Sequence, residues 1–156
     1  MAAATPSGLS LTGRALRLLS QREHSRAELE RKLRKYEEEP GTLARALDEL
    51  TAKDFISEAR VVESVLHQRA ARLGMTRVRQ ELMHKGIAPE VVAEAVASLK
   101  ETELERARDV WRRRFGELPR DATERARQVR FMMARGFAGG VVAKVLKYDP
   151  DDEQAG

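Results

Sequence analysis

Apolar residues recur at helical spacing along almost the whole chain, and the alternation typical of strands is nearly absent. Leu29 and Leu33, for example, follow Ser25 and Glu28, which have the spacing of a capping box at a helix start. Glycine and proline interrupt the pattern between apolar stretches. The pattern predicts an all-α fold with helices near residues 12–23, 25–36, 41–52, 57–72, 75–85, 89–100, 102–115, 121–135 and 139–148.

Two further helix starts carry capping signals. Thr102 precedes Glu105 by three residues, and Asp121 precedes Glu124 by the same interval. Both pairs have the spacing at which an N-cap side chain accepts a hydrogen bond from a first-turn amide. We therefore expect capped helices to begin at both places. Trp111, on the first of them, has the spacing of a core residue rather than of a base-stacking platform.

The chain matches itself at offsets of 49 and 50 residues. Residues 84–92 read HKGIAPEVV, and residues 134–142 read ARGFAGGVV. The self-match predicts three tandem three-helix repeats, at residues 12–56, 57–100 and 101–148, between a disordered tail at 1–11 and an acidic tail at 149–156. One repeat of about 45 residues cannot bury its apolar stripe alone, so we expect the repeats to stack in an elongated, solenoid-like array.

The repeated turn contains a glycine in both copies. Gly86 and Gly136 each follow an apolar helical stripe, where a left-handed residue closes the helix without a Cβ penalty. We expect Ile87 and Phe137 to pack back on the turn, and Pro89 suits the first position of the next helix. These residues are therefore interpreted as architectural.

Charge is distributed unevenly along the chain, although the net charge is only +4. Residues 12–36 carry eight basic and three acidic side chains, and residues 105–135 carry ten and five. The segment 37–104 between them carries nine and thirteen. Two basic blocks around an acidic centre indicate a polyanionic or charge-patterned partner, with solvated helix faces as the alternative reading.

Guanidinium groups in these blocks suit bidentate contacts with carboxylate or phosphate. The densest cluster runs through the second block, where Arg106 and Arg108 precede three consecutive arginines. The residues that we expect to contact a partner are Arg22, Arg26, Lys32, Lys35, Arg112, Arg113, Arg114, Arg127 and Arg130.

Signals for catalysis or cofactor binding are missing from the sequence. The chain has no cysteine, and His24, His67 and His84 lie on separate predicted segments, where we expect each to be a surface or turn residue. No phosphate-binding glycine loop is present. We expect no catalytic residue, metal site or cofactor. Because no apolar run is long enough for export or a membrane span, we expect a cytoplasmic protein without membrane contact.

Several short motifs follow one another in a specific order: Ala15-Leu16-Arg17-Leu18-Leu19, Arg22-Glu23-His24-Ser25, Glu28-Leu29, Leu50, Asp54-Phe55-Ile56, Arg60, Glu81-Leu82, Lys85-Gly86-Ile87 and Arg135-Gly136-Phe137. In this order, over residues 12–147, the chain resembles the RecX family of bacterial recombinase regulators. It departs from the family pattern at several positions. Glu37, for one, fills the glycine position of the first repeat.

The resemblance implies a protein that binds RecA and RecA filaments on single-stranded DNA. It implies that the protein modulates, mainly by inhibition, the recombinase, ATPase and co-protease activities of RecA, in homologous recombination, DNA repair and the SOS response. We expect a monomer without enzymatic activity and with weak direct DNA binding. The alternative is a helical nucleic-acid-binding protein that acts on DNA without RecA. An enzyme with an unrecognised site is the third, least supported reading.

Overall fold

The structure is a computed structural model that describes residues 8–147. Over this range the chain is helical without strands, which confirms the predicted all-α class. Residues 1–7 of the expected N-terminal tail, and all of the acidic tail at 149–156, lie outside the described residues. The helices are α1 (Leu11–Gln21), α2 (Arg26–Leu33), the 3-10 helix η1 (Arg34–Tyr36), α3 (Thr42–Ala52), α4 (Glu58–Arg69), α5 (Met75–His84), α6 (Pro89–Lys100), α7 (Glu103–Arg114), α8 (Ala122–Ala134) and α9 (Gly139–Leu146).

Contacts divide the chain into two compact units. Unit 1 comprises Met1–Ser64 together with the short turn Lys85–Ile87, and unit 2 comprises Val65–His84 and Ala88–Gly156. The turn after α5 therefore belongs to unit 1, although α5 itself belongs to unit 2. The turn Lys85–Ile87 of the predicted second repeat therefore packs with the first repeat.

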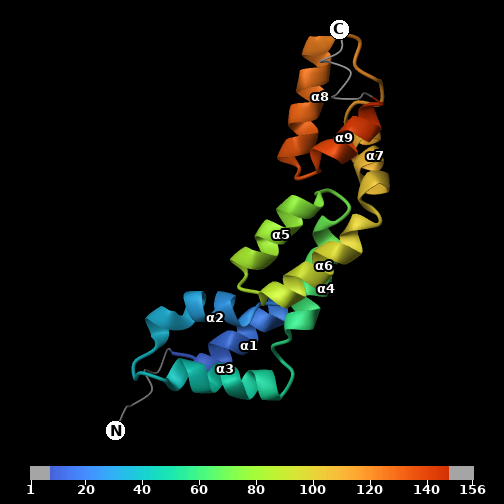
Figure 1. Cartoon of the computed structure of the whole chain (residues 1–156). Helices are drawn as coiled ribbons and strands as arrows, with labels where there is room; N and C mark the ends of the chain where they lie inside the picture. Colours follow the sequence, from blue (N-terminus) through green and yellow to red (C-terminus); the bar gives the residue numbers. More distant parts are fainter. Residues whose placement is uncertain (1–7, 148–156) are drawn as a thin grey trace. The chain divides into compact units, whose positions relative to one another are not determined.

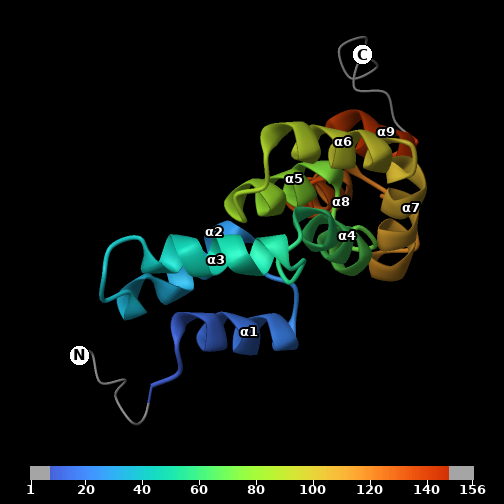
Figure 2. The ribbon, with the colours of Figure 1, turned by 90° about the horizontal axis from the view of Figure 1, so that it is seen from below.

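In unit 1, helices α1, α2 and α3 pack against one another (Figures 1 and 2). The apolar stripes meet in a core in which Ala15, Leu29 and Leu47 are fully buried. The same core includes Leu33, Leu43, Leu50 and Ile56. Burial of aliphatic side chains at about 25 cal/mol per Å² supplies most of the stabilisation of such a helical layer.

In unit 2, α5 packs on α6, and α9 packs on both α7 and α8 (Figure 1). Phe137 and Met132 lie at the centre of the second core and are almost completely buried. Ala107, Val142, Val145 and Leu146 complete this core. Trp111 is partly buried against it, as its spacing predicts, and its Nε1 donates to Oε1 of the buried Gln128 at 2.8 Å.

The repeated turns have the predicted geometry. Gly86 and Gly136 have φ angles of 74° and 91°, in the left-handed region. Ile87 and Phe137 are buried directly after them, and Pro89 occupies the first turn of α6. The left-handed helix cap therefore accounts for both copies of the turn.

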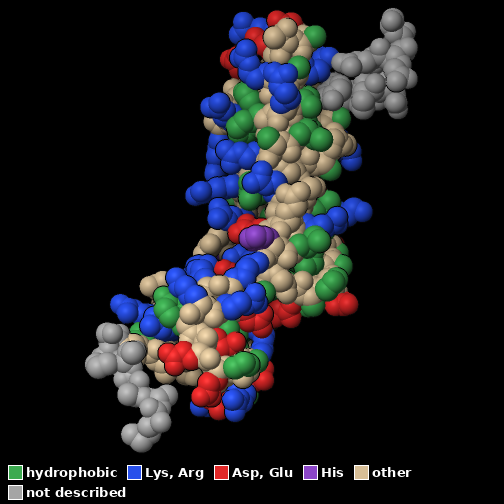
Figure 3. All heavy atoms as spheres, turned by 90° about the vertical axis from the view of Figure 1, so that its left-hand side faces the viewer, with side chains coloured by type: hydrophobic (Ala, Val, Ile, Leu, Met, Phe, Trp, Pro, Cys, Tyr) green, Lys and Arg blue, Asp and Glu red, His purple; other side chains and the backbone are tan. Residues whose placement is uncertain are grey.

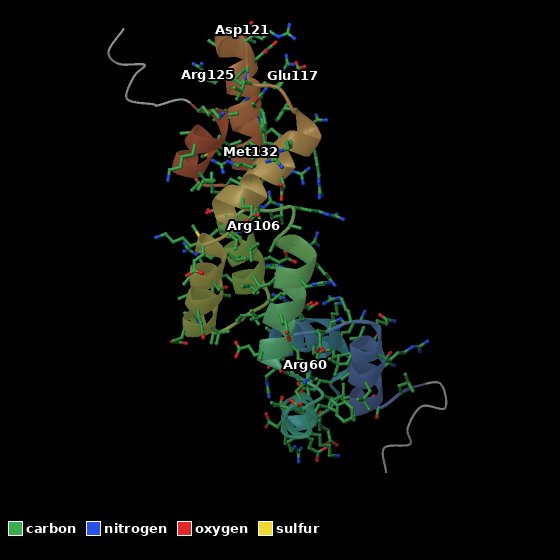
Figure 4. All side chains as sticks on the ribbon, turned by 90° about the vertical axis from the view of Figure 1, so that its right-hand side faces the viewer. Arg60, Arg106, Glu117, Asp121, Arg125 and Met132 are labelled. Atoms are coloured by element: carbon green, nitrogen blue, oxygen red, sulfur yellow. The ribbon has the colours of Figure 1, made fainter. Side chains whose placement is uncertain are left out.

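The predicted caps are confirmed at two of three helix starts. Ser25 and Glu28 form the complete capping box of α2, and the Asp121 side chain accepts from the amide of Glu124 at 2.8 Å (Figure 4). The cap expected at Thr102 is wrong. The chain leaves α6 in helical conformation, so Thr102 has a ψ of 0° instead of an extended backbone, and its hydroxyl donates to Leu99 O.

Two further expectations need correction. His24, expected at the surface, is only 1% exposed, because the short connection between α1 and α2 turns its ring inward. The spacing of Val129, Met132 and Met133 in the sequence predicts that all three lie on the apolar stripe of α8, but Met133 is 48% exposed. Neighbouring Met132 is fully buried and occupies the core position instead.

Candidate partner-binding site

A contact between consecutive repeats occurs twice in the structure, once in each unit. We call these contacts the first joint and the second joint. In the first joint, the start of α2 (Ser25 to Glu28) lies on the turn Lys85–Ile87, within unit 1. In the second, the start of α5 (Gly74 to Arg77) lies on the turn at Arg135 and Gly136, within unit 2. The two sets of residues are related by the repeat offset.

The first joint is built from side chains. The Ser25 hydroxyl donates to the carbonyl oxygen of Lys85 while it accepts from the amide of Glu28. The Glu28 carboxylate accepts from Lys85 Nζ at 3.2 Å and from Arg22 Nη2 at 2.7 Å. Gly86 permits the close approach of α2 to the turn, because a Cβ at this position would lie 2.6 Å from Cβ of Ala27.

Glu28 is 7% exposed and remains ionised. Burial by itself raises the pKa of the Glu28 carboxyl, but hydrogen bonds from Arg22, the Ser25 amide and Lys85 outweigh burial and lower the pKa to about 2. The carboxylate is therefore a fixed negative charge that holds two cations of the first joint.

His24 lies beside this joint. Nδ1 of its ring lies 3.0 Å from Arg22 O, and Nε2 lies 3.3 Å from Lys32 Nζ. Burial, followed by the charges of Arg22 and Lys32, lowers the pKa of His24. A neutral ring that donates from Nδ1 and accepts from Lys32 at Nε2 satisfies both contacts. His24 thus positions the Lys32 ammonium group.

The second joint is built mainly from backbone groups. The amide of Gly74 donates to Arg135 O at 2.7 Å, and the amide of Thr76 donates to Gly136 O at 3.2 Å. A Cβ at Gly74 would overlap the carbonyl group of Gly136, and a Cβ at Gly136 would lie 2.6 Å from the amide nitrogen of Arg77. The two glycines therefore permit an approach that side chains would prevent.

Arg106 is partly buried behind the second joint and is not part of a surface cluster (Figure 4). Its Nη1 donates to the carbonyl oxygens of Ala70 and Leu73, at 2.7 and 2.9 Å, and its Nη2 donates to Leu99 O. Burial lowers the pKa of this guanidinium. The side chain closes the turn after α4 and is structural.

The basic residues predicted in the first block separate into two groups. Arg22 and Arg26 form ion pairs within the unit: Arg22 with Glu28, and Arg26 with Glu30 and with Asp48 at 2.6 Å. These two guanidinium groups are held by the fold. Lys32 and Lys35, by contrast, line a groove.

The groove has a volume of about 610 Å³ and runs between α1 and the segment formed by α2 and η1. Two of its cations, Arg14 and Arg17, come from α1 and were missed by the sequence analysis. The signal was present, since α1 contains no acidic residue. The groove is lined by Leu9, Arg14, Arg17, Leu18, Gln21, Arg31, Lys32, Leu33, Lys35 and Tyr36.

The residues predicted in the second block are exposed on α7 and α8 of unit 2. Arg112 pairs with Asp109 on its own helix, and the Arg114 guanidinium lies 5.2 Å from the centre of the Phe131 ring. Arg113, Arg127 and Arg130 make no ion pair with the residues that the structure describes. Figure 3, which views the side of α5 and α8, shows Lys and Arg side chains in a row along this face of unit 2.

Between residues 8 and 147, no cluster of three His, Asp or Glu side chains has the arrangement of a metal site. Within the same range, no helix combines the length and apolarity needed to cross a lipid bilayer.

Comparison with known families matches all three repeats. The model described as "RecX, first three-helix domain" matches residues 13–50, the second-domain model matches residues 57–96, and the third-domain model matches residues 101–146. Together these matches cover well over half of the chain.

Two similar proteins have the name "Regulatory protein RecX". The protein of Leptothrix cholodnii is 55% identical over 139 residues, which are 89% of this chain and 88% of that one. The protein of Ralstonia nicotianae is 47% identical over the same share of this chain and 87% of its own length.

The fold is also similar to solved structures. A crystal structure of RecX from Lactobacillus salivarius superposes with a TM-score of 0.72 at 17% identity, over 88% of this chain and 92% of that one. The likeness in fold agrees with the sequence matches over the three repeats. The chain belongs to the RecX family of regulatory proteins.

Proposed function

We propose that this protein binds RecA and RecA filaments on single-stranded DNA and mainly inhibits the recombinase, ATPase and co-protease activities of RecA. The observation that carries the proposal is membership of the RecX family over all three repeats. Inhibition requires no catalytic residue, because a protein that binds one state of an assembly shifts the assembly equilibrium by mass action.

The arrangement of charge supports the same proposal. Exposed arginines lie on α7 and α8 in unit 2, and a second set of cations lines the groove in unit 1. Two sites on one chain can contact successive protomers or phosphates of a filament, and the second contact then benefits from a high effective concentration. We propose the three tandem repeats, with the boundaries predicted from the sequence, as the form in which both sites are used.

The direct test is the ATPase activity of purified RecA on single-stranded DNA, with strand exchange as a second readout. We expect this protein to reduce both at stoichiometric concentration. The proposal is wrong if the folded protein at stoichiometric concentration leaves both activities unchanged.

Charge reversal locates the contribution of unit 2. Replacing Arg112, Arg113 and Arg114 by Glu should weaken inhibition by about tenfold or more, because guanidinium contacts with carboxylate or phosphate become repulsive. A matched control reverses three exposed cations of the acidic centre, Arg45, Lys53 and Lys100, and changes the net charge equally. Equal loss in both variants would show that net charge, and not the surface of α7, matters.

The second candidate function is direct DNA binding without RecA. The observation that favours it is the groove in unit 1, which gathers cations without an acidic lining residue. A steep loss of DNA affinity with salt, together with no effect on RecA, would support this alternative, because counterion release dominates such binding.

A further inference from the structure

The groove between α1 and the α2–η1 segment differs from the other basic surfaces of the molecule in its shape and its lining. Five of its ten lining residues are Arg or Lys, and none is Asp or Glu. The acidic side chains of α2, Glu28 and Glu30, are held in ion pairs by Arg22, Lys85 and Arg26. Arg14, Arg17, Lys32 and Lys35 therefore make no ion pair with the residues that the structure describes.

The cations are also held in place. Arg14 stacks on the Tyr36 ring, with 3.7 Å between the guanidinium carbon and the ring centre, and Lys35 lies 5.2 Å from the same centre. Lys32 is positioned by the neutral ring of His24. Ordered cations lose less conformational freedom when they bind an anion than freely rotating ones do.

An aromatic and apolar component accompanies the charge. Tyr36 is 39% exposed and Leu9 is 50% exposed at the groove. Sites for single-stranded nucleic acid combine a cationic groove that follows the phosphates with exposed rings on which bases stack. An acidic peptide would also be attracted, but its carboxylates are interrupted by neutral residues, whereas a nucleic-acid strand carries one charge per nucleotide.

We propose that this groove binds the phosphate backbone of a single strand of nucleic acid, with Arg14, Arg17, Lys32 and Lys35 on the phosphates and Tyr36 against a base. The inference deepens the proposed function and rests on it for the choice of a single strand, since the filament is assembled on single-stranded DNA. The inference assigns binding of single-stranded DNA to unit 1 and binding of RecA to the arginines of α7 and α8.

The test measures binding of a fluorescently labelled 15-nucleotide oligothymidylate to the full chain over a range of salt concentrations. In the groove variant, Arg17 and Lys35 are both replaced by Glu. Both residues are exposed, so the fold should be retained, which circular dichroism and thermal melting verify. We expect the affinity to fall by about tenfold and the slope of log K against log salt to decrease by about 1.4, because two phosphate contacts are lost.

The matched control replaces Arg45 and Lys53 by Glu, which changes the net charge equally at exposed positions outside the groove. We expect less than a twofold change for this control. Tyr36→Ala should weaken binding by about fivefold or more through loss of stacking, and Tyr36→Phe should retain it. The inference is overturned if the control loses as much affinity as the groove variant, or if the unchanged protein does not bind the oligonucleotide.

Inhibition of the RecA ATPase, measured in parallel, separates this inference from the proposed function. Inhibition without oligonucleotide binding overturns the groove assignment and leaves the proposed function standing. Oligonucleotide binding through the groove without inhibition supports the groove and overturns the proposed function. If the groove variant loses inhibition but keeps its oligonucleotide affinity, the groove binds an acidic protein surface and the nucleic-acid assignment is wrong.

Discussion

The first joint and the second joint place equivalent parts of the repeat against each other with different chemistry. In the first, Ser25 and Glu28 reach the turn at Lys85 through a hydroxyl and a carboxylate. In the second, the amide of Gly74 bonds directly to the carbonyl oxygen of Arg135. Both joints need glycine in the turn, but only the second also has a glycine, Gly74, directly before the helix that approaches it.

The difference shows that one architectural contact can be stabilised in two ways with different sensitivities. The first joint depends on charge, so its strength changes when a carboxylate or an imidazole is protonated. The second depends on close backbone approach, so an added Cβ has a large effect on it. Four changes test this contrast, beginning with the largest expected effect.

Gly136→Ala should destabilise the protein by about 3 kcal/mol. An alanine in the left-handed region is strained by about 1 kcal/mol, and its Cβ would also displace Arg77 at the second joint. Urea unfolding measures the effect. The control is Gly140→Ala, where nothing lies within 4 Å of the added Cβ and helix propensity should raise stability slightly. Equal stability of the two variants would contradict the close approach of Gly136 to Arg77 at the second joint.

Glu28→Gln should cost about 2 kcal/mol, because it removes the charge that pairs with Lys85 and Arg22 while it preserves the shape of the side chain. Unfolding at neutral pH measures the loss. If the first joint is only a steric contact, the variant will be as stable as the unchanged protein.

The pH dependence of unfolding gives a second readout for Glu28. Its pKa in the folded protein is about 2, below the ordinary value of 4.5. The unfolded chain therefore takes up this proton first, so the stabilisation is fully present above about pH 4.5 and is lost as pH falls toward 2. In Glu28→Gln this part of the pH profile should be flatter. In Gly136→Ala it should persist.

Ser25→Ala should cost about 1.5 kcal/mol, since it removes both an N-cap and the bond to Lys85 O. Ser10→Ala is the matched control, because Ser10 caps α1 through the Gly13 amide. A cost of about 0.5 kcal/mol is expected there. If both substitutions cost the same, the bond of Ser25 to the turn contributes nothing beyond the cap.

The smallest effect concerns His24. Its pKa is lowered in the folded protein from the ordinary value of 6.5, chiefly by burial. The unfolded chain is therefore protonated first, and stability should begin to decrease as pH falls through about 6.5. His24→Gln should flatten this region of the profile. An unchanged profile would mean that the folded protein accommodates the charged ring at no cost.

The helices and the repeat were predictable because apolar spacing and the glycine turns are local signals. The cap expected at Thr102 was wrong, because the turn between α6 and α7 leaves Thr102 with a ψ of 0° and without a side-chain cap bond. His24 could not be placed, since its burial depends on the turn between α1 and α2 and on Lys32 eight residues later. For the site, charge density located the two basic blocks. It could not show that Arg22 and Arg26 are held in ion pairs while Arg14 and Arg17 complete a groove.

Each joint consists of a helix start and a glycine turn, and both parts recur in the sequence at the repeat interval. One more copy of the 49–50-residue unit would therefore add both a helix start and a turn on which a helix start can pack. The number of repeats can therefore change during evolution without a new interface. Glu37 departs from this pattern. At the position equivalent to Gly86 it has a φ of −77°, and its carboxylate accepts from the amide of Leu43 within its own repeat. A helix start could approach this turn as closely as Ala27 approaches Gly86 only if glycine stood at this position.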